Sequence, residues 1–134
     1  MRARIGQRGQ GISLYLRYKE ESGRLRLRAP VPLKDTSGQE LRTPIPYHHG
    51  FEVADWDNDG KLDLFTNEKT QLILYRNTGS GYERKPILFD GKPLSVSHHE
   101  TSIRAVDWDK DGSLDLITGG ESGWVYYFAR SVLQ

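Results

Sequence analysis

Short apolar runs separated by polar turns follow one another along the whole chain. The runs are rich in β-branched and aromatic residues, and clusters of Gly, Asn, Asp and Ser bound them, which is typical of β-strands. No stretch of 11 residues has a helical period, and runs such as LDLF and WVYYFA suit strands packed on both faces. The pattern predicts strands near residues 11–18, 24–29, 50–55, 61–66, 71–76, 83–89, 102–107, 113–118 and 123–129, with a weaker strand near 2–6. Residues 77–81, NTGSG, predict a hairpin loop.

Two of these segments are copies of each other. VADWDNDGKLDLF at residues 53–65 matches AVDWDKDGSLDLI at 105–117, with equivalent positions 52 residues apart. A histidine pair precedes each copy, and an aromatic or apolar strand follows it. GISLYLRY at 11–18 resembles the strand QLILYRN at 71–77, but no aspartate loop accompanies it. A period near 50 residues with several strands per unit indicates propeller blades or another stacked β array.

Each copy contains a loop of the form D-x-D-x-D-G-x-x-D. Four carboxylates within nine residues repel one another unless a cation neutralises them, and alternating hard oxygen ligands suit Ca²⁺. The sequence therefore predicts two calcium sites, completed by the main-chain carbonyls of Lys61 and Ser113 and by water. The predicted carboxylate ligands are Asp55, Asp57, Asp59 and Asp63 in the first loop, and Asp107, Asp109, Asp111 and Asp115 in the second.

The spacing differs from that of an EF-hand. An EF-hand has a Glu at position twelve, where this chain has Thr66 and Thr118, and its flanks are helical. Here the last ligand is the aspartate at position nine, at the start of the next strand, so the expected geometry is strand, loop, strand. The alternative is a pair of ordinary acidic turns, since Asp-Gly is a common hairpin signal.

The loop with its flanking strands resembles the VCBS/FG-GAP repeat, over residues 48–81 and 98–130. Similar calcium loops occur in the propellers of integrin α-subunits and rhamnogalacturonan lyases. The resemblance implies an all-β fold of four-stranded antiparallel propeller blades, with Ca²⁺ between the first and second strands of a blade. It also implies an extracellular or periplasmic setting.

About two and a half blades are expected from 134 residues, forming a single repeat unit. Residues 1–47 form a degenerate partial blade, 48–97 a blade with a calcium loop, and 98–134 a partial blade with a second loop. Propellers generally close with four to eight blades. The chain is therefore expected to belong to a longer propeller or to form homo-oligomers; a small open β array is the third possibility.

Other residues form weaker candidate sites. The four histidines, His48, His49, His98 and His99, occupy equivalent places before the loops, where they either bind a ligand or serve the strand entry. Three arginines, Arg24, Arg26 and Arg28, alternate along one strand face, which suits an acidic ligand or a solvated edge strand. Trp56 and Trp108 recur at position two of the loops and are expected to pack beside them.

The composition of the chain excludes several classes of function. The chain has no Cys, which excludes disulfides and cysteine chemistry. No apolar run is long enough for a membrane span, and no signal peptide is recognisable. The net charge of +1 divides into +6 for residues 1–50 (10 Lys and Arg against 4 Asp and Glu) and −5 for residues 51–134 (9 against 14). With an acidic main part and no recognition motif, nucleic acid is not an expected partner.

These features favour a calcium-binding interaction module whose partner is a polysaccharide or a protein, and they assign no catalytic residue. The first alternative is part of a glycan-active enzyme similar to a polysaccharide lyase, using the histidine pairs and the arginine face. The second is a purely structural assembly subunit.

Overall fold

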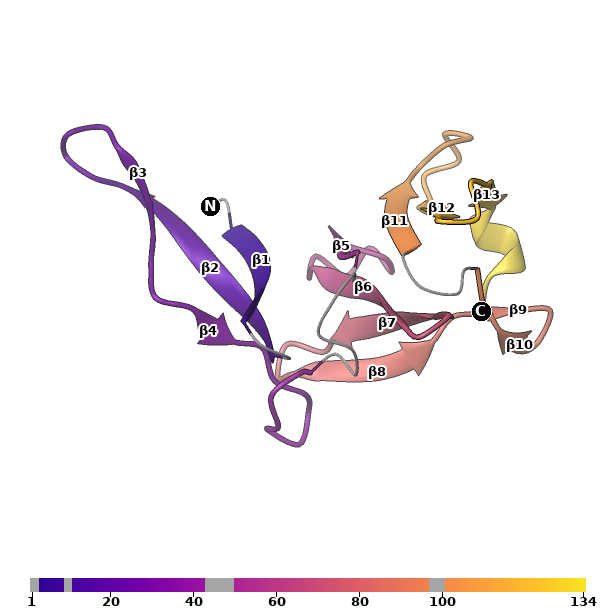
Figure 1. Ribbon diagram of the computed structural model, residues 1–134, viewed down its shortest axis with the longest axis horizontal. Coiled ribbons are helices and arrows are strands. Elements are labelled where there is room, and N and C mark those ends of the chain that lie inside the picture. The colour runs from indigo at the N-terminus through magenta and orange to yellow at the C-terminus, as the bar shows by residue number, and fades with distance from the viewer. Residues whose placement is uncertain (1–2, 9–10, 43–49, 97–100) are drawn as a thin grey trace.

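The computed structural model describes residues 3–8, 11–42, 50–96 and 101–134, and it is built from antiparallel β-sheets (Figure 1). A single turn of 3₁₀ helix, η1 (Arg130–Val132), lies near the end of the chain. None of the helices in the described ranges is long and apolar enough to cross a membrane. The predicted all-β class is therefore confirmed.

The first complete sheet, called the first blade below, has four strands in sequence order. They are β5 (Glu52–Ala54), β6 (Asp63–Glu68), β7 (Gln71–Asn77) and β8 (Tyr82–Pro86). The predicted hairpin loop joins β7 to β8, where Thr78 N–H donates to the Gly81 carbonyl at 2.9 Å. Gly79 has a φ of 88°, a conformation that glycine adopts without steric cost.

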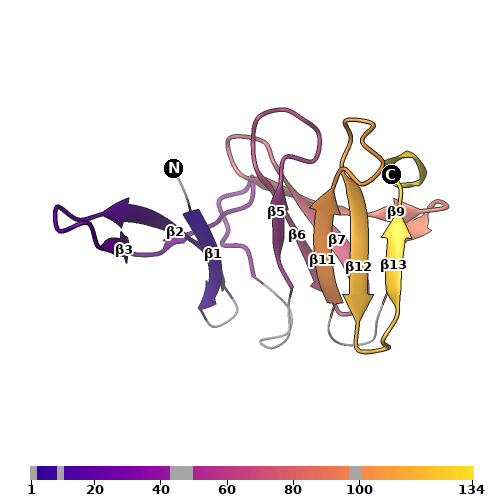
Figure 2. The same ribbon diagram turned by 90° about the horizontal axis from the view of Figure 1, so that it is seen from above.

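A second sheet, the second blade, repeats the first three strands of this arrangement. It contains β11 (Thr101–Val106), β12 (Asp115–Gly120) and β13 (Val125–Phe128). Figure 2 shows β5 and β11 side by side, so the two blades stack face to face. An ion pair links these first strands, with Arg104 Nη1 at 3.1 Å from Glu52 Oε2.

A small hairpin after the first blade and the end of the chain after the second blade join the two blades. The hairpin consists of β9 (Leu88–Phe89) and β10 (Lys92–Pro93). Leu88 and Gln134 exchange two main-chain hydrogen bonds, at 2.8 and 3.0 Å. The segment after the second blade is thereby held to the segment that follows the first.

The N-terminal strands form a separate arm that projects from the blades (Figure 1). They are β1 (Ala3–Arg8), β2 (Gly11–Lys19), β3 (Leu25–Leu27) and β4 (Val31–Pro32), and β2 pairs with each of the other three. The arm is attached to the first blade by a main-chain hydrogen bond from Tyr82 N–H to the Lys34 carbonyl, at 3.0 Å.

The first blade is buried on both faces, which explains its successive apolar positions. Phe65, Leu72 and Leu74 point to the second blade and form the larger core with Ile103 and Leu116. On the opposite face, the side chains of Leu64, Ile73 and Tyr75 form a second core with Ile12, Leu33 and Leu41 of the N-terminal arm. Because strand side chains alternate between faces, each central strand contributes to both cores.

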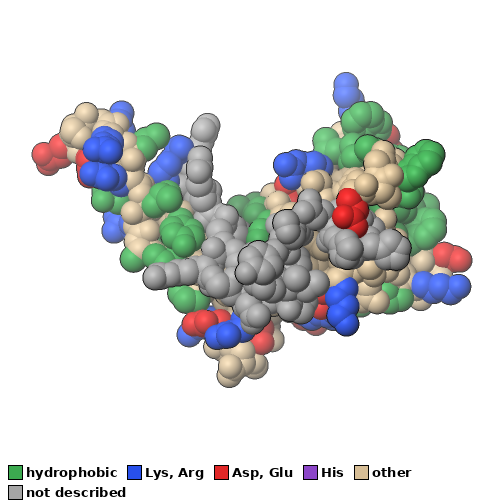
Figure 3. Space-filling model, in the orientation of Figure 1, with side chains coloured by type: hydrophobic (Ala, Val, Ile, Leu, Met, Phe, Trp, Pro, Cys, Tyr) green, Lys and Arg blue, Asp and Glu red, His purple; other side chains and the backbone are tan. Residues whose placement is uncertain are grey.

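The second blade is covered on one face only. Strand pairing makes Ile117, Val125 and Tyr127 equivalent to Phe65, Leu72 and Leu74 of the first blade. Phe65 and Leu72 are fully buried, whereas Val125 is 74% and Tyr127 is 46% exposed. Figure 3 shows hydrophobic side chains gathered at the end of the molecule where Figure 1 places β13. This exposed surface, defined by Ile117, Val125 and Tyr127, is called the outer face below.

The strand predictions are confirmed with small shifts at their ends. Two short strands, β4 and β10, were not predicted, because two-residue pairings leave no pattern of alternation in the sequence. The run predicted at 83–89 is divided into β8 and β9, with Ile87 between them buried in the larger core.

Tyr75 makes the stability of the first blade sensitive to alkaline pH. Burial, and then the charge of Glu68, which accepts a hydrogen bond from the Tyr75 hydroxyl at 2.9 Å, raises the pKa of Tyr75 to about 12. An unfolded tyrosine ionises near pH 10, so this stabilisation is complete below pH 10 and is lost as the pH rises to 12. We expect a loss of about 1.4 kcal/mol for each pH unit in that window.

Urea unfolding between pH 9 and 11 in a chelating buffer would measure this loss. The Tyr75→Phe variant should lose this component of the pH dependence, whereas Tyr18→Phe, at an exposed position on the arm, should retain it. Equal slopes for Tyr75→Phe and the unmodified chain would contradict the assignment.

Candidate metal centre

The two aspartate loops occupy the same place in both blades, between the first and second strands. Loop one (residues 55–63) joins β5 to β6, and loop two (residues 107–115) joins β11 to β12. Their backbones turn alike, because Gly60 and Gly112 have φ values of 84° and 91°, and Asn58 and Lys110 have 57° and 62°. The predicted strand, loop, strand geometry is therefore confirmed.

The first aspartate of each loop folds the chain around its own carboxylate. Asp55 accepts hydrogen bonds from the main-chain N–H groups of Asp59 at 3.0 Å and Gly60 at 2.9 Å. Asp107 accepts one from Gly112 at 3.1 Å. Its other oxygen, Oδ1, is buried and has no hydrogen-bond partner among the described residues. A buried carboxylate oxygen without a hydrogen-bond partner costs free energy, so a cation or a water molecule is expected to bind this atom.

The ninth residue of each loop binds the main chain at the end of the third strand of its blade or just after it. Asp63 is 1% exposed and accepts main-chain hydrogen bonds from Trp56 at 3.0 Å and Asn77 at 2.7 Å. Asp115 is fully buried and accepts the equivalent bonds from Trp108 at 3.1 Å and Arg130 at 2.8 Å. These two carboxylates therefore have a structural role in addition to any metal ligation.

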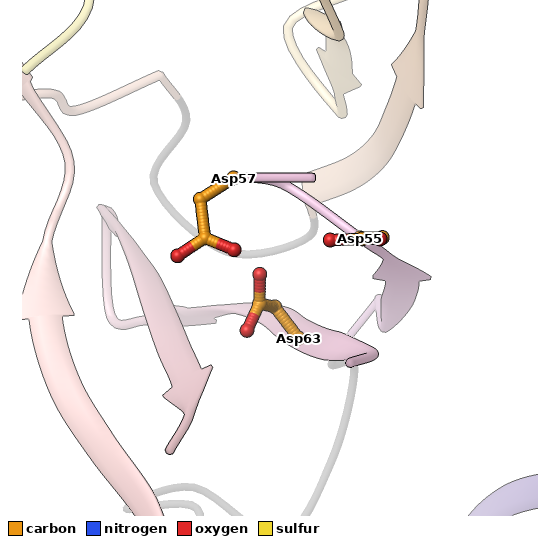
Figure 4. A group of neighbouring side chains, drawn as sticks. All are labelled: Asp55, Asp57 and Asp63. Carbon is orange, nitrogen blue, oxygen red and sulfur yellow. The ribbon is translucent and has the colours of Figure 1, made fainter. Parts of the chain in front are cut away.

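Three carboxylates converge in each loop, but the two sets differ. In loop one they belong to Asp55, Asp57 and Asp63, and Figure 4 shows the carboxylates of Asp57 and Asp63 facing each other. In loop two they belong to Asp107, Asp109 and Asp111. In each set, one ligand oxygen per residue lies within 4.8 Å of the others.

These separations fit Ca²⁺. With calcium–oxygen distances of about 2.4 Å, ligands on opposite sides of the ion are about 4.8 Å apart. All the converging donors are hard oxygens, and the unpartnered Oδ1 of Asp107 lies in one of the sets. Asp59 and Asp115 stand outside the converging sets, and the main-chain carbonyls of Lys61 and Ser113 stay predicted ligands.

The electrostatic environment of the loops is uneven. Burial, followed by the charges of Asp57 and Asp59, raises the pKa of Asp63. Burial also acts to raise the pKa of Asp115, but hydrogen bonds from the main chain of Arg130 and Trp108 outweigh it and the pKa is lowered. The side-chain hydrogen bond from Lys61 lowers the pKa of Asp59.

Basic side chains surround loop one. Arg76 Nε on β7 donates to Asp57 Oδ2 at 2.5 Å, and Lys61 Nζ lies 2.7 Å from Asp59 Oδ2. The Arg130 guanidinium lies over the Trp56 ring, 3.8 Å from its centroid, a favourable cation–π contact. Burial lowers the pKa of Arg130, and the charge of Asp57 opposes that shift. A cavity of about 250 Å³ beside the loop is lined by these two arginines, Trp56 and Lys85.

Sequence analysis missed these basic neighbours. Arg76 lies thirteen residues beyond the last aspartate of loop one and Arg130 fifteen beyond that of loop two. The hairpin register brings Arg76, at the end of the third strand, beside loop one, and the packing of the two blades brings Arg130 over Trp56. A systematic comparison of the two copies would have flagged position 76, because the equivalent residue in the second blade is Ala129.

The remaining candidates are the histidines and the arginines of the arm. The histidines, His48, His49, His98 and His99, lie outside the described residues. Arg24, Arg26 and Arg28 lie in and beside β3 on the projecting arm, at the opposite end from the second blade (Figure 2). Arg26 pairs with Glu20 at 2.9 Å, and Arg28 stacks on Tyr18. Their role as a ligand site stays a prediction.

The tryptophans of the two loops differ sharply in burial. Trp56 is 8% exposed and packs edge-on against Phe65, with ring centroids 5.2 Å apart, as expected. Trp108 is 65% exposed and contacts the Tyr127 ring at 6.5 Å. The expectation of packing beneath or beside the loop is therefore confirmed for Trp56, whereas Trp108 stays largely exposed, because none of the described residues covers the outer face.

Comparison with known proteins finds one sequence similarity, and it covers both loops. Neither the curated proteins nor the solved structures gave a match to this chain. One family model does match, that of the FG-GAP-like repeat, over residues 55–118. The matched segment contains both aspartate loops, so this part of the chain is similar in sequence to FG-GAP-like repeats, and its antiparallel sheets are consistent with β-propeller-like blades.

Proposed function

We propose that the chain is a calcium-binding repeat module, in which two Ca²⁺ ions occupy loop one and loop two and stabilise the blades. The observation that carries the proposal is the convergence of three carboxylates within 4.8 Å in both copies of the loop. The similarity of residues 55–118 to FG-GAP-like repeats supports it. The proposed ligands are the eight loop aspartates together with the carbonyls of Lys61 and Ser113.

Calcium would neutralise the mutual repulsion of each carboxylate set. A bound ion would also join the end of one strand to the start of the next, so binding free energy becomes folding free energy. Asp63 and Asp115 already fix each loop to the main chain at the end of the third strand of its blade or just after it, so each loop is held in place before an ion binds.

Isothermal titration calorimetry with CaCl₂ tests the proposal. We expect two calcium ions per chain, weak or no binding of Mg²⁺, and no binding to the Asp57→Ala, Asp109→Ala double variant. Mg²⁺ is a control for calcium-specific binding, because it requires tight octahedral geometry and gives up its bound water reluctantly. Absence of calcium heat in the unmodified chain, with its fold verified by circular dichroism, would overturn the proposal.

The proposed biological role is calcium-dependent interaction with a polysaccharide or a protein, in an extracellular or periplasmic setting where millimolar calcium fills even weak sites. The outer face supports an interaction role, since Val125, Tyr127 and the neighbouring Trp108 expose a continuous apolar and aromatic surface. Retention on immobilised polysaccharides or proteins, with calcium and with EDTA, would identify the partner class.

A further inference from the structure

The two loops share their aspartates but differ at two neighbouring basic positions. Lys61, at position seven of loop one, corresponds to Ser113 in loop two. Arg76, at the end of β7, corresponds to Ala129. The second equivalence follows from the strand register, in which Leu64 pairs with Tyr75 and Leu116 pairs with Phe128.

In loop one, these side chains already neutralise two of the aspartates. Arg76 contacts Asp57 at 2.5 Å and Asp59 at 3.7 Å, and Lys61 contacts Asp59 at 2.7 Å. Arg76 belongs to a strand in the middle of the first blade, so its position is fixed by the sheet. A calcium ion that binds Asp57 and Asp59 must displace both cations or bind beside them.

Among the described residues, loop two has no counterpart of these ion pairs. In the part of the chain that the structure describes, no Lys or Arg side chain lies within 4.0 Å of its carboxylates. Lys110 lies within loop two, but its side chain is exposed and forms no ion pair with the loop carboxylates in the described part of the chain. Arg130 leaves the second blade and places its guanidinium over Trp56, beside loop one. The unpartnered Oδ1 of Asp107 is a further unmet demand for positive charge in loop two.

We infer that the two calcium sites are unequal, with loop two the high-affinity site and loop one a weaker site whose own Lys61 and Arg76 compete with the metal. This inference rests on the proposed calcium-binding function, and it assigns the difference in calcium affinity to Lys61 and Arg76. Displacing two charged contacts should weaken loop one by about tenfold relative to loop two. As calcium falls, loop one would empty first and remain neutralised, whereas loop two would lose its only cation.

Single-loop variants separate the two affinities. Asp57→Asn disables loop one, so that only loop two binds calcium, and Asp109→Asn disables loop two, so that only loop one binds calcium. Both residues are exposed, so the fold should survive. Calorimetry should give a dissociation constant about tenfold larger for Asp109→Asn than for Asp57→Asn. Adding Lys61→Ser and Arg76→Ala to Asp109→Asn should remove most of that difference.

The reciprocal exchange and a charge-matched control complete the test. Ser113→Lys with Ala129→Arg, added to Asp57→Asn, should weaken loop two by a similar factor. Lys19→Ala with Lys92→Ser changes the net charge equally at exposed positions away from the loops and should change neither affinity by more than about twofold. Thermal melts in EDTA verify that each variant is folded.

The outcomes distinguish this inference from the function beneath it. Equal affinities in the two single-loop variants, or no gain on removing Lys61 and Arg76, would overturn the inequality and leave calcium binding intact. No binding to either variant or to the unmodified chain would overturn the calcium function itself. An effect of the control pair as large as that of the loop pair would assign the difference to net charge and would also overturn the inference.

Discussion

Saturating calcium should raise the free energy of unfolding of this chain by about 5 kcal/mol. An ion that binds only the folded state stabilises it by about 2.7 kcal/mol when its free concentration is 100 times the dissociation constant, and the chain has two proposed sites. For a domain of this length, each kcal/mol shifts the melting temperature by about 4 °C, so the total shift approaches about 20 °C. The effect is large because the stability of small domains is itself only about 5–15 kcal/mol.

Thermal melts in EDTA, in excess calcium and in excess magnesium would measure this shift. The Asp57→Asn, Asp109→Asn double variant should lose the calcium-specific part, because each substitution removes one converging carboxylate. Glu21→Gln with Asp90→Asn neutralises two exposed carboxylates outside the loops and should keep the shift. Identical melting in calcium and EDTA would mean that the loops are ordinary acidic turns.

The strands and loops were accessible from the sequence because their signals are local. Alternating apolar positions, Asp-Gly turns and the repeat of 52 residues identify most strands and both aspartate loops within windows of about ten residues. Asp63 and Asp115 illustrate this, since their position at the start of β6 and β12 follows directly from the spacing of the motif.

The exchange of Lys61 for Ser113 is visible in the sequence, but the contacts that make the copies differ were not accessible, because they depend on what packs against each loop and blade. Arg76 neutralises Asp57 of loop one only because the β6–β7 hairpin brings residue 76 beside residue 57. Likewise, Asp59 leaves the converging set of loop one while its counterpart Asp111 belongs to that of loop two. A repeat motif predicts what the copies share, whereas tertiary contacts decide where they diverge.

Replacing Trp56 by alanine should destabilise the chain by about 3–5 kcal/mol, whereas the same change at Trp108 should cost less than about 1 kcal/mol. The two residues have the same position in the repeat, but Trp56 is 8% exposed and Trp108 is 65% exposed. Removing Trp56 leaves a cavity against Phe65 and takes away the surface on which Arg130 rests. Removing Trp108 loses only its contact with the exposed ring of Tyr127.

Urea unfolding of both variants in EDTA would compare them without any contribution from calcium. Because the substitutions are chemically identical and occupy equivalent loops, propensity and unfolded-state effects largely cancel in the difference. That difference therefore measures what the second blade contributes by covering the first. Comparable losses at the two positions would show that the outer face is covered in solution, by a second copy of the chain, and a concentration-dependent transition for the unmodified protein would accompany that result.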